Sequence, residues 1–403
     1  MKILQINAVY EYSSTGRNVQ EMHEFYISKG HESYVAAKNV KSFGNFIKIG
    51  NNFDYKIHAF FSRLTGLQGH YSFFSTKILI AKIKKIKPDI IHLHNLHSNY
   101  INYPILLKFI RKYDIPTVIT LHDCWPFTGH CCYFIDSNCC KWQNKCGHCP
   151  DLHRWNKSWF FDKTAKQLEE KKMLFSNIPH LAVIGVSDWV TSFVKSSILR
   201  NAEIVRRIYN WIDTDLFSPK DVTQLRLRLT LNDEFVVLGI AQRWTEQKGI
   251  NEFIKLASIC NDIKFVLVGL IPKEYNRFIL PNMICVGSIN NVHDLVQYYS
   301  LGDVFFNPSS RETFGKVTVE ALACGTPVIG YDTTATPELI KSKCGYVVSK
   351  NNLSQVVECI KKIKLRGKTY YTQNCVRFAK SEFSSEVLLE QHLKIYQDIL
   401  KNK

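Results

Sequence analysis

Short apolar runs alternate along the whole chain with longer stretches in which apolar residues recur at helical spacing. Runs that are apolar throughout are typical of parallel strands that helices cover on both faces. In the first half of the sequence they predict strands at Lys2–Asn7, Ser33–Ala37, Ile90–His94, Thr117–Leu121 and Ala182–Val186. A polar turn at residues 13–17 predicts that a helix follows over residues 17–29.

A second series of the same kind begins after residue 213. It predicts strands at Phe235–Ala241, Lys264–Val268, Met283–Val286, Val304–Asn307, Pro327–Gly330 and Gly345–Val348. The two series indicate an α/β fold of two Rossmann-like parallel-sheet domains, over residues 1–205 and 206–383. The amphipathic stretch at residues 384–403 predicts a helix that returns to the first domain. Two such domains are expected to face one another across a cleft, with ligands at the carboxyl ends of the strands.

Length and composition fit this picture, and the charge adds a candidate surface. The 403 residues suit two domains, and the formal net charge is +17. Residues 1–205 are the more basic part, with 26 Lys and Arg against 15 Asp and Glu and a cluster at Lys82, Lys84, Lys85 and Lys87. The cluster is either a solvated helix face or a surface that attracts anionic lipid headgroups or a pyrophosphate-linked substrate. No recognition motif for nucleic acid accompanies it, so we expect no nucleic-acid partner.

The N-terminal residues do not have the pattern of a secretory signal. Met1–Asn7 is a short apolar run without a long apolar core or a small-residue cleavage site. The longest apolar runs, such as Phe235–Ala241, are far shorter than a membrane-spanning helix. We therefore expect a cytoplasmic protein, with peripheral contact to the inner face of the plasma membrane as the role that the basic cluster suggests.

The segment from Asn307 to Ile329 carries two carboxylates around the predicted start of a helix. Glu312 lies in a loop, Gly315 lies where the helix begins, and Glu320 lies inside the helix. A helix N-terminus offers unpaired N–H groups and a positive dipole end, which suit a phosphate, and glycine lets the backbone approach a ligand closely. Ionised carboxylates accept hydrogen bonds from hydroxyls, so one could bind a sugar and the other a ribose.

Cationic residues suited to a phosphate lie upstream, after the strand predicted at Phe235–Ala241. Arg243 and Lys248 are five residues apart, in the loop and at the start of the next helix. Arginine binds phosphate through two parallel hydrogen bonds, and lysine adds a mobile point charge. Together they suit a leaving nucleoside diphosphate, on whose oxygens negative charge grows as the glycosidic bond breaks.

These residues resemble the signature of a known family. Glu312 and Glu320, with Arg243 and Lys248 upstream, resemble the E-x7-E pattern of retaining GT-B glycosyltransferases, family 4 in particular. The segment at residues 210–219 is similar to the family's segment between the two domains, except that a tryptophan stands where the family has glycine. The resemblance covers nearly the full chain and implies the GT-B fold.

The resemblance also implies a role for each of these residues. The groups expected to hold the diphosphate are the side chains of Arg243 and Lys248 and the backbone N–H groups around Phe314, Gly315 and Lys316. Glu320 is expected to accept hydrogen bonds from the ribose. Glu312 is expected to accept them from the sugar and to stabilise its oxocarbenium-like charge.

The first domain carries a polar pair at the end of a strand. His122 and Asp123 follow the strand predicted at Thr117–Leu121, at the edge where ligands bind. In the family a histidine at this place contacts the donor sugar, which implies that role for His122 and an acceptor-side role for Asp123. The turn at Gly16 resembles the family's first-domain glycine loop, reduced here to one glycine, with Arg17 placed to reach a phosphate.

Seven of the thirteen cysteines crowd into an insertion at residues 124–150. The passage around them resembles a subgroup that acts in colanic-acid and O-antigen polysaccharide assembly. Cys146 and Cys149 form a C-x2-C pair and, with Cys131 and Cys139, could form a tetrahedral structural zinc site. The spacing leaves two alternatives open, namely reduced packed cysteines and a disulfide or redox function.

The resemblance implies a retaining hexosyltransferase of bacterial surface polysaccharide synthesis. It would move a sugar from a UDP- or GDP-sugar to a growing glycan, with a polyprenyl-pyrophosphate-linked acceptor suggested by the basic first domain. No carboxylate is placed as a covalent nucleophile, so we expect same-face attack. No D-x-D motif calls for a divalent ion, so no cofactor is expected in catalysis. The alternatives are a GT-B sugar-nucleotide epimerase or phosphorylase, and a metal- or nucleic-acid-binding protein.

Overall fold

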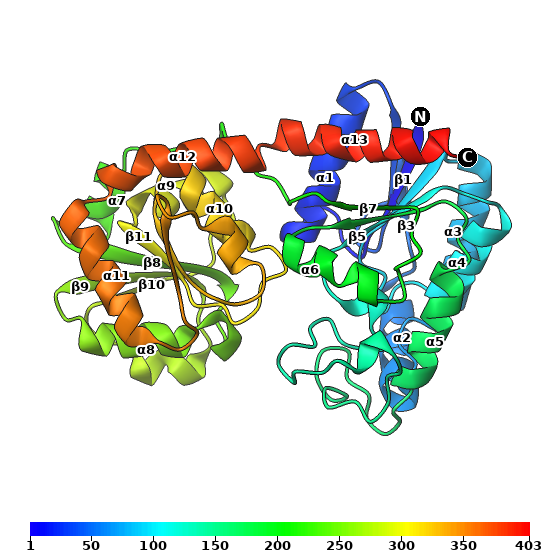
Figure 1. Cartoon of the computed structure of the whole chain (residues 1–403), viewed down its shortest axis with the longest axis horizontal. Coiled ribbons are helices and arrows are strands. Elements are labelled where there is room, and N and C mark those ends of the chain that lie inside the picture. The colour runs from blue at the N-terminus through cyan, green and yellow to red at the C-terminus, as the bar shows by residue number, and fades with distance from the viewer. The chain divides into compact units, whose positions relative to one another are not determined.

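The computed structural model describes residues 1–403, which divide into two compact units. The first unit holds Met1–Tyr209 and Leu389–Lys403, and the second holds Asn210–Leu388. Each unit is built on one parallel sheet with helices on both faces (Figure 1). The boundaries expected at residues 205/206 and 383/384 lie a few residues before those of the units. None of the helices combines the length and the apolar composition that crossing a bilayer requires.

The sheet of the first unit has seven parallel strands in the order β3-β2-β1-β4-β5-β6-β7. Its strands are β1 (Lys2–Ile6), β2 (Glu32–Ala37), β3 (Phe46–Lys48), β4 (Ile90–Leu93), β5 (Thr117–Leu121), β6 (Leu181–Gly185) and β7 (Ile204–Arg207). Its helices are α1 (Ser13–Ser28), α2 (Asn52–Thr65), α3 (Phe73–Ile86), α4 (Tyr103–Lys112), α5 (Thr164–Phe175), α6 (Asp188–Ser192), the short 3-10 helices η1 (Trp125–Phe127), η2 (Lys141–Gln143) and η3 (Val194–Ser196), and most of α13 (Ser385–Lys401).

The sheet of the second unit has six parallel strands in the order β10-β9-β8-β11-β12-β13. Its strands are β8 (Phe235–Arg243), β9 (Ile263–Leu270), β10 (Met283–Val286), β11 (Val304–Asn307), β12 (Val328–Tyr331) and β13 (Gly345–Val348). Its helices are α7 (Thr223–Arg228), α8 (Ile250–Ile259), α9 (Val292–Leu301), α10 (Lys316–Ala323), α11 (Leu353–Arg366), α12 (Thr369–Phe383) and the short 3-10 helices η4 (Glu246–Lys248), η5 (Lys273–Phe278) and η6 (Thr336–Leu339).

The central strands are apolar because both of their faces are buried. Every residue of β4, β5, β6, β11 and β12 is buried, and each run that the sequence predicts as a strand is one. The pattern does not predict β3 and β7, which are edge strands that expose Lys48, Arg206 and Arg207. An edge strand needs no continuous apolar run, so its sequence resembles that of a loop.

The first helix begins earlier than predicted. The turn expected at residues 13–17 is wrong, because α1 already starts at Ser13 and includes Gly16 and Arg17 in its first turns. The left-handed residues at this turn are Glu11 (φ 62°), in the loop after β1, and Ser13 (φ 63°), the first residue of α1. Gly16 therefore lies in the helix and not in a glycine loop.

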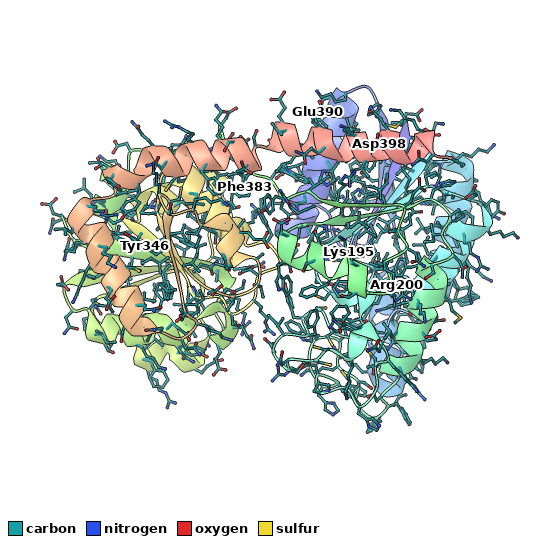
Figure 2. All side chains as sticks on the ribbon, viewed as in Figure 1. Lys195, Arg200, Tyr346, Phe383, Glu390 and Asp398 are labelled. Atoms are coloured by element: carbon teal, nitrogen blue, oxygen red, sulfur yellow. The ribbon has the colours of Figure 1, made fainter.

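The last helix packs into the core of the first unit. Tyr396 of α13 is fully buried, and its hydroxyl lies 2.9 Å from the hydroxyl of Tyr26 and 2.6 Å from Nδ1 of His92. On the surface, Lys29 pairs at 2.5 Å with Glu390, which Figure 2 labels on this helix. The C-terminal residues from Leu389 are thus an integral part of the first unit.

Strand order places the ligand-binding edge of each sheet. In an open parallel sheet, ligands bind at the carboxyl ends of the two neighbouring strands between which the chain order reverses. In the first unit these strands are β1 and β4, and in the second unit they are β8 and β11. The loops that follow these strands are therefore where a site is expected.

Candidate functional site

The loops after β8 and β11 bring a lysine and a glutamate of the predicted site into contact. Nζ of Lys248 lies 2.6 Å from Oε1 of Glu312. The lysine side chain is 42% exposed and the glutamate side chain 13%. The carboxylate is largely withdrawn from water and holds the ammonium group at the surface, at the edge of the sheet where a ligand is expected.

Backbone contacts fix the two loops against each other. The N–H of Ser310 donates to the carbonyl of Gln247 at 3.1 Å, and the hydroxyl of Thr245 caps the 3-10 turn η4 by accepting from the N–H of Lys248 at 3.3 Å. The N–H of Glu312 donates to Oγ1 of Thr334 at 2.8 Å. These hydrogen bonds therefore hold the two loops that carry the ion pair in place.

Helix α10 starts beside this ion pair with no side chain capping its first turn. Its N-cap is Gly315, whose φ of 98° is a left-handed conformation that other residues rarely adopt. A Cβ at this position would lie 3.6 Å from Cβ of Glu312. Phe314, 3% exposed, packs on the ring of Phe383 and anchors the loop before the helix, with Lys316 as the first helical residue. Uncapped N–H groups at such a start are suited to an anion.

The second carboxylate of the predicted pair lies inside α10 and is buried. Glu320 is 2% exposed, and its Oε2 accepts a hydrogen bond from the hydroxyl of Tyr299 at 2.6 Å. Tyr299 was missed by the sequence reasoning, because it lies in α9 and no local pattern connects it to Glu320. It orients the carboxylate that we expect to contact the ribose.

Arg243 ends β8, and its side chain is exposed. A register shift between Ile240 and Arg243 interrupts the pairing of β8 with β9. Gly269 makes this irregularity possible, because its φ is 119° and a Cβ there would collide with the carbonyl oxygen of Ala241. The guanidinium group is not part of the ion pair of Lys248 and Glu312.

In the first unit, His122 follows β5 directly and is held by a second histidine. Nε2 of His122 lies 3.0 Å from Nδ1 of His94, which follows β4, and the two rings stack. Burial lowers the pKa of His122 to about 4, although the charge of Asp123 acts in the opposite direction. The imidazole is therefore neutral at physiological pH.

A chain of buried histidines extends behind His122. The rings of His92 and His94 lie 4.1 Å apart, and Nε2 of His92 is 2.7 Å from Oγ1 of Thr120. Burial, with the neighbouring histidines, lowers the pKa of both His92 and His94 well below the usual value. The sequence reasoning missed these residues, although their alternate spacing at the end of a predicted strand was a usable signal.

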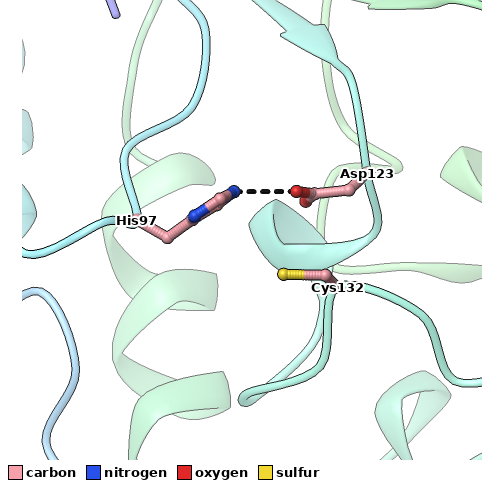
Figure 3. Close-up of side chains that lie close together, drawn as sticks. All are labelled: His97, Asp123 and Cys132. Carbon is pink, nitrogen blue, oxygen red and sulfur yellow. Dashed lines mark hydrogen bonds and ion pairs between the residues drawn. The ribbon is translucent and has the colours of Figure 1, made fainter. Parts of the chain in front are cut away.

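Asp123 is buried in a small group of polar side chains with His97 and Cys132 (Figure 3). Nε2 of His97 lies 2.7 Å from one carboxylate oxygen, and the N–H of Trp125 donates to the other at 2.9 Å. Burial alone would raise the pKa of Asp123, but the charge and hydrogen bond of His97 and the N–H of Trp125 lower it. The ligand atoms of His97, Asp123 and Cys132 lie within 4.8 Å of one another, close enough to hold a metal ion.

The cysteines predicted as zinc ligands come together in the structure. Cys131, Cys139, Cys146 and Cys149 line one small cavity in the insertion. A cavity of the second unit lies elsewhere, at the amino ends of β8, β9 and β11, where Phe235, Asp262 and Asp303 line it. That is the opposite edge of the sheet from Lys248 and Glu312, so it is not the predicted site.

Comparison with known proteins identifies the family. The model of Glycosyltransferase Family 4 matches residues 15–216, which is half of the chain, and the model of Glycosyl transferases group 1 matches residues 221–380. N-acetyl-alpha-D-glucosaminyl L-malate synthase of Bacillus anthracis is 26% identical over 240 residues, which are 54% of this chain and 62% of that relative. The match thus spans less than two thirds of the relative's length.

Two further proteins resemble the chain over a larger share. The putative colanic acid biosynthesis glycosyl transferase WcaC of Escherichia coli is 24% identical over 331 residues, 77% of each chain. The solved structure of HepE from Anabaena in complex with UDP has a TM-score of 0.68 at 17% identity and covers 99% of this chain and 100% of that chain. The protein therefore belongs to glycosyltransferase family 4, and it is a glycosyltransferase with the GT-B fold.

Proposed function

We propose that the protein transfers a sugar from a UDP- or GDP-sugar to a growing glycan with retention of the anomeric configuration. The observation that carries this proposal is the contact of Lys248 with Glu312 beside the uncapped start of α10. It combines a cation and helix N–H groups for a diphosphate with a carboxylate for sugar hydroxyls. The solved complex of HepE with UDP supports a nucleotide donor.

Each residue then has a defined part in the transfer. Lys248 and Arg243 neutralise the diphosphate with the N–H groups around Phe314, Gly315 and Lys316, and Glu320 accepts from the ribose. We assign the donor sugar to Glu312 and His122, further contact with the donor to Gly16, and the acceptor side to Asp123 and Arg17. Because Glu312 holds Lys248 at 2.6 Å, the ammonium group is already in place when the donor arrives.

The chemical step needs no covalent enzyme intermediate. The bond from the anomeric carbon to the phosphate oxygen breaks, and the acceptor oxygen bonds to the same face of that carbon. The acceptor proton passes to the departing phosphate oxygen, which leaves as the nucleoside diphosphate. Arg243, Lys248 and the N–H groups of α10 supply the positive charge, so we propose that catalysis requires no divalent ion.

We place the transfer in bacterial surface polysaccharide synthesis, such as that of O-antigen, capsule or exopolysaccharide. The similarity to WcaC, whose name refers to colanic acid, supports this placement. A polyprenyl-pyrophosphate-linked glycan is the proposed acceptor, because its lipid and its phosphates suit a basic surface that touches a membrane.

A donor and product assay tests the transferase proposal. A panel of UDP-, GDP-, ADP- and dTDP-sugars is screened by thermal shift, since a ligand that binds the folded state raises the melting temperature. The donor found is then incubated with glycan acceptors and chelator, and the new linkage is assigned by NMR. We expect the new glycosidic bond to have the same anomeric configuration, axial or equatorial, as the bond to phosphate in the donor. An inverted linkage would contradict retention, and epimerised or phosphorolysed sugar without transfer would indicate the other GT-B activities.

Exposed aromatic side chains gather on α2, on the start of α3 and on the loop before α5 in the first unit. They are 40% to 78% exposed and form what we call the aromatic surface: Phe53, Phe60, Phe61, Phe73, Phe74, Trp159, Phe160 and Phe161. The rings of Phe60 and Trp159 lie 5.8 Å apart and connect α2 with the loop before α5. Oγ of Ser75 donates to Asp54 at 3.0 Å and connects α3 with α2.

We propose that the aromatic surface docks on an anionic bilayer. Its exposed basic neighbours are Lys56, Arg63, Lys77, Lys157 and Lys163, and Nζ of Lys77 lies 4.2 Å over the ring of Phe73. Aromatic rings with lysines and arginines around them fit the headgroup region of such a bilayer. The exposed lysines near the end of α3, Lys84, Lys85 and Lys87, extend the positive charge.

Vesicle binding checks this surface. Exchanging both Phe74 and Phe160 for serine should weaken binding to vesicles of phosphatidylglycerol and phosphatidylcholine by about 100-fold or more, since each of the two buried rings contributes about 1.5–3 kcal/mol. The matched control is Phe278→Ser in the second unit, a ring 44% exposed outside this surface. Equal loss in both variants, or no binding of the unchanged protein to anionic vesicles, would contradict the proposal.

A further inference from the structure

The four cysteines Cys131, Cys139, Cys146 and Cys149 line the same small cavity, together with His130 and Trp142. The cavity between them has room for about one water-sized sphere. None of the four forms a disulfide.

We propose that Cys131, Cys139, Cys146 and Cys149 bind one structural Zn²⁺. Four thiolates in a tetrahedral arrangement select zinc or an iron–sulfur cluster, and a cavity for one small sphere fits a single ion and not a cluster. The four sulfur atoms lie farther from one another than the ligand atoms of His97, Asp123 and Cys132, which are all within 4.8 Å. Binding would draw them to about 3.8 Å from one another, the separation that Zn–S bonds of about 2.3 Å imply.

Hydrogen bonds already fix the turn between two of the cysteines. Nζ of Lys141 donates to the carbonyls of Gly147 (3.1 Å) and His148 (3.0 Å), which are the two residues between the C-x2-C cysteines. A turn fixed by hydrogen bonds from outside is a feature of the surroundings of a metal site.

His130, beside Cys131 in the wall of the cavity, is 2% exposed. Neither of its ring nitrogens has a hydrogen-bond partner in the protein. A buried polar group of this kind costs free energy unless it finds a partner. A zinc-bound thiolate would give its N–H an acceptor, and this orphaned ring is independent support for an anionic centre in the cavity.

A buried lysine lies in α5, the helix whose first residue, Thr164, lines the cavity. Lys171 of α5 is fully buried, and its Nζ donates to the carbonyls of Trp125 (2.8 Å) and Thr128 (2.9 Å) and not to a carboxylate. A Zn²⁺ ion with four thiolates would be an anionic centre that favours the ammonium form of this side chain.

The centre would stiffen the loop that carries Asp123, one of the proposed acceptor-side residues. Cys131 ends a segment that starts at Asp123, and the N–H of Cys124 donates to the carbonyl of Cys132 at 2.9 Å. The zinc would join this segment to residues 139–149, which otherwise contain only the short helix η2. The proposal does not depend on the transferase mechanism, because it concerns metal content and folding.

Metal analysis of the full chain, purified without chelator, tests the proposal first. We expect about one zinc per chain and no stoichiometric iron. Less than about 0.2 equivalents of zinc would overturn the proposal, given the tight binding of structural zinc. Replacing the zinc by Co²⁺ should give the intense thiolate-to-metal charge-transfer bands of a four-sulfur tetrahedral site. A spectrum of mixed nitrogen, oxygen and sulfur ligands would place the metal at His97, Asp123 and Cys132 and also overturn it.

Serine variants identify the ligands. Cys139→Ser and Cys149→Ser should lose most of the bound zinc. The matched control is Cys140→Ser, which changes an exposed cysteine next in sequence to Cys139 that does not line the cavity. It should keep about one equivalent. Full zinc content in both ligand variants would contradict the assignment, and if these variants fail to fold, the Co²⁺ spectrum of the unchanged protein decides.

Discussion

Replacing Lys248 by alanine should lower kcat by about 10²–10⁴, the scale on which removal of a charge that stabilises a transition state acts. The ammonium group is 2.6 Å from Glu312, a residue that lies beside Gly315 at the start of α10. Its loss removes a cation from the departing diphosphate. It also leaves the carboxylate, 13% exposed, without its partner, which is costly for a largely buried charge.

Initial-rate kinetics with saturating acceptor measure this effect, and two further variants interpret it. Lys248→Arg keeps the charge and should recover part of the rate. Lys255→Ala removes an exposed lysine from α8 and should leave kcat unchanged. Arg243→Ala should lower kcat by a factor in the same range as Lys248→Ala. Near-normal activity of both alanine variants would count decisively against the proposed leaving-group site.

Acid should destabilise the first unit well above the pH at which its carboxylates titrate. The pKa of His122 is lowered to about 4 by burial, and burial also lowers the pKa values of His92 and His94 well below the usual value. In the unfolded chain each histidine titrates near 6.5. Between these values the unfolded state binds protons that the folded state does not, so protonation favours unfolding and stability falls as the pH drops below about 6.5.

The effect is large because the histidines are neighbours and each acts in the same direction. Each contributes about 1.4 kcal/mol per pH unit inside its window, so three together reach about 4 kcal/mol per unit. The groups that face His122 are His94, His97, His392 and Asp123. The lowered pKa of Asp123 also makes the first unit less stable in acid, because the stabilising charge is lost as the pH falls through the pKa of the folded state.

Urea unfolding followed by circular dichroism between about pH 7 and pH 4.5 measures this slope. His122→Gln should flatten it by about 1.4 kcal/mol per pH unit. His293→Gln, which changes an exposed histidine of α9 in the second unit, should leave it unchanged. A slope that is the same in all three proteins would show that His122 is charged in the folded state.

Local sequence was enough to predict the elements whose signal is contained in one segment. The strand, loop and helix from Asn307 to Ala323 are predicted because an apolar run, a polar loop with Gly315 and an amphipathic stretch follow each other directly. The same holds for the central strands, since burial of both faces demands apolar residues throughout. The edge strands β3 and β7 escape prediction because one side of each has no partner strand and tolerates charge.

Contacts between segments far apart in the sequence could not be predicted in this way. Tyr299 reaches Glu320 across a helix pair, and His94 reaches His122 only because β4 and β5 are adjacent. The start of α1 was misjudged because non-glycine residues, Glu11 and Ser13, take the left-handed conformations that a turn usually assigns to glycine. The sequence thus indicates which residue types could act, and the packing shows which of them meet.

A crystal structure of the protein with UDP or GDP is the most direct test of the central claim. The account predicts that the diphosphate lies at the start of α10, hydrogen-bonded to Nζ of Lys248 and to the N–H groups of Gly315 and Lys316, with the ribose hydroxyls on Glu320. A nucleotide bound with its diphosphate away from α10 and from Lys248 would contradict it.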